Sequence, residues 1–104
     1  MPIKIVKEET VESYYLKAIA EAFPGSETVK YEVRRGEPDR LTLLPGGKAI
    51  FVELKRPNKH PRPEQERALE RKRKLGFDAH YANTKEKVDA LIAYLLERQA
   101  RGWI

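Results

Sequence analysis

The stretch at residues 36–57, GEPDRLTLLPGGKAIFVELKRP, is the most informative part of the chain because it predicts two strands joined by a tight turn. Runs rich in β-branched and large apolar residues cover 39–44 and 48–55, and they flank Pro45-Gly46-Gly47. A short glycine-containing connection between two such runs is typical of a β-hairpin. This stretch is therefore expected to form an antiparallel pair of strands.

The hairpin register predicts that two acidic side chains converge. With a three-residue turn, Leu44 pairs with Lys48, and Asp39 then lies opposite Glu53. Directly opposed residues of an antiparallel pair project to one face with their Cβ atoms about 4.5–5.5 Å apart. Lys55 follows Glu53 by two positions and so shares that face.

Two adjacent carboxylates suggest a cation site. They repel each other and raise the pKa of one of them unless a divalent ion lies between the oxygens. Mg²⁺ suits such a pair because it is commonly held by one or two carboxylates, with water and phosphate completing its shell. Lys55 would then hold or activate a water, or stabilise charge on a phosphate. The alternative is a plain salt bridge between Lys55 and either acid, and the spacing alone leaves both interpretations open.

The rest of the chain alternates between helical and strand patterns. The periodicity predicts helices at 8–23 and 63–75, a helix from the cap Thr84 to about Gly102, and further strands at 28–34 and 77–82. The order α-β-β-β-α-β-α indicates an α/β domain over 1–104, with helices packed on the faces of one sheet.

Composition narrows the classes of protein that the chain could be. The absence of cysteine excludes a disulfide framework and a thiolate zinc site. No apolar run approaches the roughly 20 residues of a membrane helix, so we expect no membrane partner and a cytoplasmic location in a bacterial, archaeal or phage-infected cell. The net charge is +5, and basic residues crowd 55–74, which is compatible with a polyanionic partner. A solvated helix face is the commoner explanation of such a run, so the cluster alone decides nothing.

Three motifs together carry a family resemblance. GEPDR and VELKRP, separated by the glycine turn, and RPEQ at the start of a helix resemble the PD-(D/E)XK nuclease superfamily. Within it the chain is similar to the small standalone form of the VRR-NUC family, the virus-type replication-repair nucleases, from about residue 12 to 92. The resemblance implies a restriction-endonuclease-like core with a mixed central sheet flanked by helices.

The resemblance also implies roles for individual residues. Asp39 and Glu53 would be metal ligands, the backbone carbonyl of Leu54 would assist them, and Lys55 would be the catalytic lysine. Gln65 matches the glutamine at the start of the second helix of the family. Its alternative role is to accept a hydrogen bond from the backbone of its own helix.

A glutamate of the first helix completes this implied site, and two candidates compete for it. We prefer Glu12 to Glu9 because Glu12 lies on the helical line of Ile19 and Phe23. Glu12 would act as a catalytic residue, coordinating the metal directly or through a water. The alternative is that it merely complements the helix dipole.

Basic residues are the expected contacts to DNA. The resemblance implies Lys30 and Arg40, and the basic cluster supplies the others: Arg56, Lys59, Arg62, Arg67, Arg71 and Lys74.

The carboxylate pair and the resemblance together predict an endodeoxyribonuclease dependent on Mg²⁺ or Mn²⁺. The resemblance to standalone family members further implies a homodimer that acts on branched DNA, specifically four-way (Holliday) junctions. Tyr14 and the terminal pair Trp103-Ile104 suggest apolar surface that a monomer leaves uncovered. Two alternatives stay open: a nuclease directed to flaps or nicks, and a nucleic-acid-binding module without catalytic activity.

Overall fold

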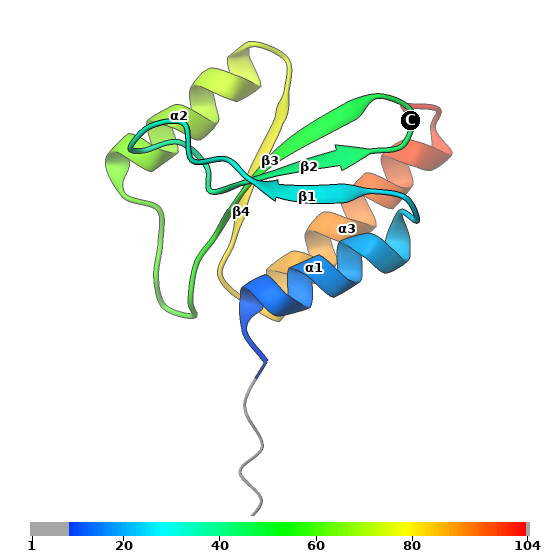
Figure 1. The fold of residues 1–104 in the computed structure, drawn as a ribbon, viewed down its shortest axis with the longest axis horizontal. Helices are drawn as coiled ribbons and strands as arrows, with labels where there is room; N and C mark the ends of the chain where they lie inside the picture. The colour runs from blue at the N-terminus through cyan, green and yellow to red at the C-terminus, as the bar shows by residue number, and fades with distance from the viewer. Residues whose placement is uncertain (1–8, 104) are drawn as a thin grey trace, which may run out of the picture.

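A computed structural model describes residues 9–103 and confirms the predicted order of helices and strands (Figure 1). The seven elements run α1 Val11–Ala22, β1 Glu27–Lys30, β2 Arg40–Leu44, β3 Lys48–Leu54, α2 Pro63–Lys74, β4 Asp78–Ala82 and α3 Lys85–Ala100.

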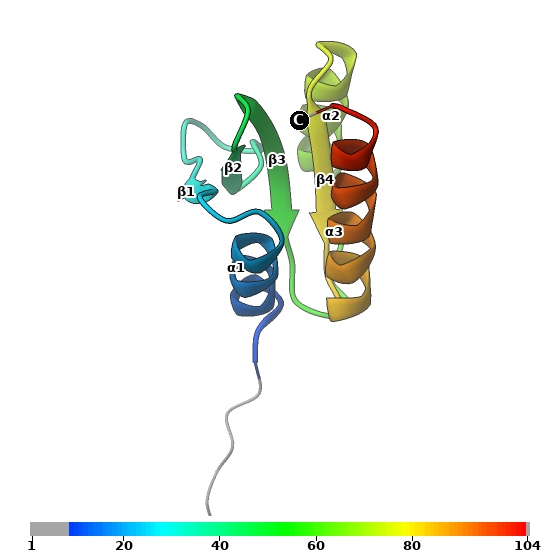
Figure 2. The same cartoon turned by 90° about the vertical axis from the view of Figure 1, so that its right-hand side faces the viewer.

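The four strands form one mixed sheet in the order β1-β2-β3-β4. β1, β2 and β3 are antiparallel neighbours, and β4 runs parallel to β3. Leu44 pairs with Lys48 and Arg40 with Val52, so the next position along this register sets Asp39 against Glu53 as predicted. Helices α1 and α3 cover one face of the sheet, while α2 lies on the other face behind β4 (Figure 2).

Local signals account for where the helices begin. The Thr10 hydroxyl accepts a hydrogen bond from the Ser13 amide at 3.0 Å, and Thr84 caps α3 in the same way. α1 therefore starts at Val11 rather than at Glu8, which lies outside the described residues. Pro63 opens α2, where its missing N–H costs no helical hydrogen bond. Among the described helices, none is long and apolar enough to cross a membrane.

The first strand is shorter than predicted. The alternating pattern of residues 28–34 suggested a strand to Arg34, but β1 ends at Lys30. One further ladder bond runs from the Tyr31 amide to the Asp39 carbonyl at 2.9 Å, after which the chain turns away from the sheet. Val33 is 61% exposed, so its apolar side chain gains no burial that would hold the segment in the sheet.

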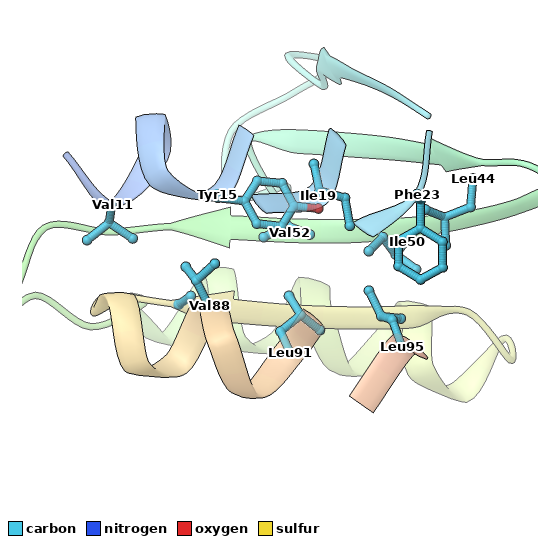
Figure 3. Close-up of a cluster of buried hydrophobic side chains, with 11 residues drawn as sticks. Val11, Tyr15, Ile19, Phe23, Leu44, Ile50, Val52, Val88, Leu91 and Leu95 are labelled. Atoms are coloured by element: carbon cyan, nitrogen blue, oxygen red, sulfur yellow. The ribbon is translucent and has the colours of Figure 1, made fainter. Parts of the chain in front are cut away.

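Side chains of β3 point alternately to the two faces of the sheet, so they contribute to two separate hydrophobic clusters. Ile50 and Val52 pack with α1 and α3 side chains in the main cluster (Figure 3). Phe51 points to the opposite face and packs with Leu69 of α2. Because side chains alternate along a strand, Glu53 shares the face of Phe51 and emerges on the α2 side of the sheet.

Two residues that suggested uncovered apolar surface are packed within the chain. The Tyr14 hydroxyl donates to Asp89 of α3 at 2.5 Å. The Arg98 guanidinium lies 4.2 Å from the centroid of the Trp103 ring, and Lys48 approaches the same ring. Tyr14 and Trp103 therefore do not support self-association, and Ile104 lies outside the described residues.

Candidate active site

The β2–β3 hairpin brings two carboxylates together where β3 ends. Asp39 Oδ1 accepts a hydrogen bond from the Leu54 amide at 3.2 Å, which attaches Asp39 to the neighbouring strand. The Glu53 side chain is only 4% exposed. Its Oε2 is buried and has no hydrogen-bond partner among the described residues. An unpartnered buried acceptor is costly, so this oxygen is the feature of the site that most needs a ligand or a proton.

Both acids bind protons more strongly than usual. Burial, and then the nearby Asp39 carboxylate, raises the pKa of Glu53 to about 7, although Lys55 partly opposes the shift. Burial also raises the pKa of Asp39, against the effect of the Leu54 N–H. The repulsion inferred from the hairpin register is thus part of the electrostatics of the site.

Lys55 lies beside this pair. Its Nζ is 3.6 Å from Glu53 Oε1, so the salt bridge considered from the sequence is present. Its backbone N–H donates to the Ala82 carbonyl at 3.0 Å and prolongs the β3–β4 ladder. This bond fixes the backbone from which the lysine side chain extends toward Glu53.

The donor set fits a hard divalent cation. Within residues 9–103 no three metal-binding side chains cluster together, so the two carboxylates and the Leu54 carbonyl are the candidate donors. Mg²⁺ and Mn²⁺ prefer such oxygen donors and need only one or two carboxylates from the protein. The unpartnered Glu53 Oε2 is consistent with this use.

Glu12 borders the site from α1. With Leu54, Lys55 and Arg56 it lines a cavity of about 280 Å³. Its carboxylate accepts a hydrogen bond from Arg40, which also donates to the Asp39 carbonyl at 3.0 Å. Glu12 is therefore linked to Asp39 through Arg40.

The competing candidate, Glu9, forms a different contact. Its carboxylate pairs with Lys17 of α1 at 2.8 Å.

Gln65 is buried on the inner stripe of α2 with Ala68 and Leu69. Its Oε1 accepts a hydrogen bond from the Arg62 amide at 2.8 Å, which is the capping role considered as its alternative. The structure thus gives Gln65 a local partner at the helix start.

Comparisons with known proteins agree with this geometry. A solved structure described as a VRR_NUC domain is 38% identical, with a TM-score of 0.64, and the match covers 82% of this chain and 97% of that one. The chain belongs to the VRR-NUC nuclease family. A protein of Acyrthosiphon pisum secondary endosymbiont phage 1, named "Putative nuclease p44", is 37% identical over 76 residues, or 71% of this chain and 80% of its own length.

A more distant VRR-NUC structure supports the fold alone. It is described as a VRR_NUC domain protein, is 16% identical with a TM-score of 0.59, and the match covers 88% of this chain and 89% of that one. No family model matches the chain.

One buried acid of this VRR-NUC chain escaped the sequence analysis. Glu37, inside GEPDR, accepts hydrogen bonds from Lys72 and from Arg34 Nε, the latter at 3.1 Å, and lies 3.5 Å from Arg71 Nη2. Two of these partners lie on α2, more than thirty positions along the chain. The residues around Glu37 in the sequence do not predict its burial, because its contacts with Arg71 and Lys72 form only when α2 packs over this loop.

The expected DNA contacts fall into two groups. Arg71 is paired with Glu37, and Arg40 with Glu12. The remaining residues are exposed on β1, on the loop after β3 and on α2, although Arg62 pairs with Glu64 at 3.0 Å: Lys30, Arg56, Lys59, Arg62, Arg67 and Lys74.

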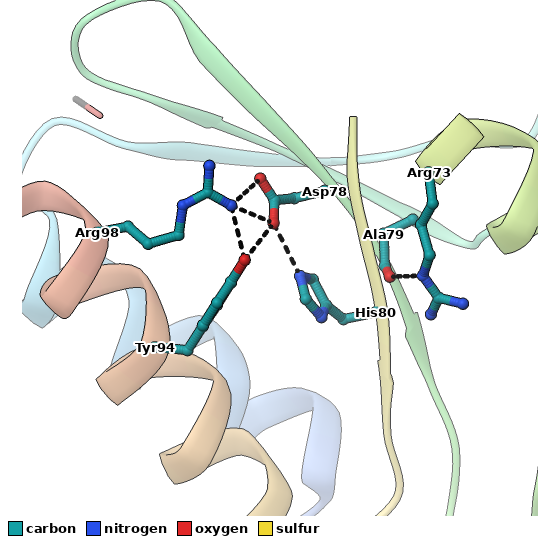
Figure 4. A network of polar contacts seen from close by, with 6 residues as sticks. All are labelled: Arg73, Asp78, Ala79, His80, Tyr94 and Arg98. Carbon is teal, nitrogen blue, oxygen red and sulfur yellow. Dashed lines mark hydrogen bonds and ion pairs between the residues drawn. The ribbon is translucent and has the colours of Figure 1, made fainter. Parts of the chain in front are cut away.

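A second polar cluster lies at the other end of the sheet (Figure 4). Asp78 pairs with Ile50 in the β3–β4 ladder, whereas the candidate site adjoins Leu54 and Ala82. The Asp78 carboxylate accepts hydrogen bonds from Arg98 at 3.1 Å and lies 3.3 Å from His80 Nε2. These contacts join β4 to α3, which gives the cluster a structural role.

Proposed function

We propose that the chain is a divalent-metal-dependent endodeoxyribonuclease. The observation that carries this proposal is the Asp39–Glu53 pair, in which Asp39 is half-buried, Glu53 is buried, and one Glu53 oxygen has no partner in the described chain. Membership of the VRR-NUC family and the fit of the donor set to Mg²⁺ or Mn²⁺ support the same activity.

Each site residue has a distinct proposed task. Asp39, Glu53 and the Leu54 carbonyl would hold the cation. When bound, Mg²⁺ or Mn²⁺ lowers the pKa of water and neutralises charge on a phosphoryl group. Lys55, which is 3.6 Å from Glu53, would place its ammonium group against the phosphate and the attacking water.

Two further residues would support these groups. Glu12 borders the same cavity as Lys55 and would act from there as a catalytic residue through a water. Gln65 would orient the start of α2 next to the site through its hydrogen bond to the Arg62 amide.

DNA would be held by its backbone. Arg67 and Lys74 lie seven positions apart on α2 and so share one helical face, while Lys59 extends from the loop after β3. Such contacts to phosphate supply affinity without reading sequence. Selectivity would then come from the shape of the DNA and from assembly.

The finer proposal is a homodimer that cuts four-way junctions. A two-fold dimer presents one site to each of two symmetric strands, and resolution requires both cuts. Val29 and Leu43 support self-association because they lie on the sheet face of Phe51 and are 43% and 41% exposed. A nuclease directed to flaps or nicks, acting as a monomer, is the alternative substrate class.

The proposed chemistry is tested with variants of the carboxylate pair. Asp39→Asn and Glu53→Gln should each reduce cleavage of a labelled four-way junction by at least about a hundredfold with Mn²⁺, because each removes a charged metal ligand. DNA binding without metal should persist or tighten, since each change removes negative charge beside the phosphate. Lys55→Ala should lose cleavage while still binding Mn²⁺.

Glu70→Gln is the matched control, because it makes the same charge change at an exposed position of α2. Wild-type cleavage by Asp39→Asn would refute the ligand assignment. A wild-type chain that binds branched, nicked and flapped DNA but leaves all of it intact with Mg²⁺ or Mn²⁺ would indicate the non-catalytic binding module.

A further inference from the structure

Glu37 is a buried anion held by three cations. Its side chain is 2% exposed, and it accepts hydrogen bonds from Arg34 at 3.1 Å and from Lys72. Arg71 Nη2 approaches the same carboxylate at 3.5 Å. The Lys72 side chain is itself 11% exposed, and its ammonium group lies 5.2 Å from the centroid of the Phe51 ring. The cluster therefore joins the loop before β2 to α2 through the buried Glu37–Lys72 contact, with the more exposed Arg34 and Arg71 at its rim.

The cluster is tightly constrained, because hydrogen bonds from Lys72 and Arg34 hold the buried Glu37 carboxylate. A charge removed from water is strongly destabilising when it loses its partners. Glu37 and Lys72 consequently restrict each other to one arrangement.

Two rigid neighbours connect this cluster to the candidate metal site. Pro38 is fully buried and separates Glu37 from Asp39, and its ring fixes the backbone φ angle. On the other side, Gly36 has φ of +89°, and a Cβ there would lie 3.4 Å from the Glu64 side chain of α2. The backbone that leads into Asp39 is thus pressed against α2.

Asp39 is also held from the opposite layer of the molecule. Arg40 donates to the Asp39 carbonyl at 3.0 Å and to Glu12 of α1. Asp39 therefore lies between an anchor to α1 on one side and the Glu37 anchor to α2 on the other.

We propose that Glu37, with Lys72, is a positioning residue that holds Asp39 against Glu53 for metal binding. This role rests on the proposed function. It also assigns Lys72 and Arg71 of α2 to the integrity of the site, and leaves Arg67 and Lys74 for DNA.

The test compares Mn²⁺ affinity by calorimetry and cleavage kinetics for the full chain. Glu37→Gln should weaken Mn²⁺ binding about tenfold and lower kcat, because loss of a partner that orients a metal ligand has effects of this order. KM for DNA should stay within about twofold, since Glu37 is buried and does not face the phosphates. Glu70→Gln, with the same charge change, should leave the Mn²⁺ affinity and kcat unchanged.

Lys72→Met separates positioning from simple electrostatics. Methionine keeps the apolar contact with Phe51 but removes the ammonium group. If Glu37 acted only through its charge, Glu37→Gln would weaken Mn²⁺ binding and Lys72→Met would strengthen it. Positioning requires that both variants weaken it, and Lys72→Met provides a decision even if Glu37→Gln fails to fold.

The outcomes are distinguishable. Variants that melt at lower temperature yet bind Mn²⁺ and cleave as the wild type does would overturn the positioning role and make the cluster purely structural. A wild-type chain that does not bind Mn²⁺ would overturn the proposed function and this role with it. Weaker Mn²⁺ binding in both variants, with unchanged KM, would support the proposal.

Discussion

Glu53 combines deep burial with an unpartnered oxygen, and this combination makes its protonation responsive to pH. Its ordinary pKa of 4.5 rises to about 7 in the folded chain. Between these values the folded state binds a proton that the unfolded state has released. Its contribution to stability is therefore fully present below about pH 4.5 and is lost as the pH rises through about 7.

We expect this loss to be measurable in the metal-free protein. Between pH 5 and pH 8 the free energy of unfolding should fall by about 2.5 kcal/mol more in the wild type than in Glu53→Gln, which has no proton to lose. Urea unfolding at a series of pH values measures the difference. The comparison between the two proteins removes the opposing contribution of His80, whose pKa is lowered by burial. Parallel pH profiles would show that Glu53 ionises normally.

Mn²⁺ binding at Glu53 should have the opposite pH dependence to the metal-free protein. The cation needs the deprotonated carboxylate, so the stabilisation that it provides should grow as the pH rises through about 7 and should be largely absent in Glu53→Gln. Equal stabilisation of both proteins would place the cation elsewhere.

α2 presents three functional surfaces. Ala68 and Leu69 pack into the sheet, while Arg71 and Lys72 contact Glu37. Arg67 and Lys74 are exposed and make no ion pair within residues 9–103. The bases of α2 are therefore partly structural, and Arg67 and Lys74 form the outer face of α2 that is free to contact phosphates.

The outer face should account for part of the salt dependence of DNA binding. Replacing Arg67 and Lys74 together with glutamine should weaken binding to all DNA sequences alike and reduce the log–log salt slope by about 0.9 for each phosphate that the variant no longer neutralises. Replacing Lys17 and Arg101, exposed bases of α1 and of the end of α3, is the matched control. A slope equal to that of the wild type would make the outer face a solvated surface.

The layered arrangement leaves part of the molecule available for assembly. α2 covers the β4 side of its sheet face, whereas Val29 and Leu43 stay more than 40% exposed on the β1–β2 side. Apolar residues gathered on an open sheet face commonly mark an interface. A second copy placed there would produce the symmetric pair of sites that a four-way junction requires.

A substitution on this face should separate assembly from chemistry. Leu43→Lys should shift the mass measured by light scattering at micromolar concentration from dimer to monomer, because it places a charge in the interface while costing the exposed monomer little. Paired nicks in a mobile four-way junction should become single, uncoupled nicks. Leu96→Lys, at a leucine of α3 that is 39% exposed, is the control. A monomeric wild type that nicks flaps would favour the alternative substrate class.

Local sequence is sufficient to define much of the hairpin. Its register depends only on the length of the turn and on strand alternation, both of which are local properties, so Asp39 and Glu53 could be paired before any tertiary contact was known. The helix starts at Pro63 and Thr84 are predictable for the same reason, because capping involves residues within one turn. The Thr10 cap of α1 is equally local, but the periodicity alone placed the start of that helix too early.

Tertiary packing decides instead which charged side chains form ion pairs within the chain and which stay available to DNA. Glu37 meets Lys72 because α2 folds over the loop, and Arg40 meets Glu12 because α1 packs on the opposite face of the sheet. These contacts join residues about thirty positions apart, and burial sets their energies, which no local pattern of residues encodes.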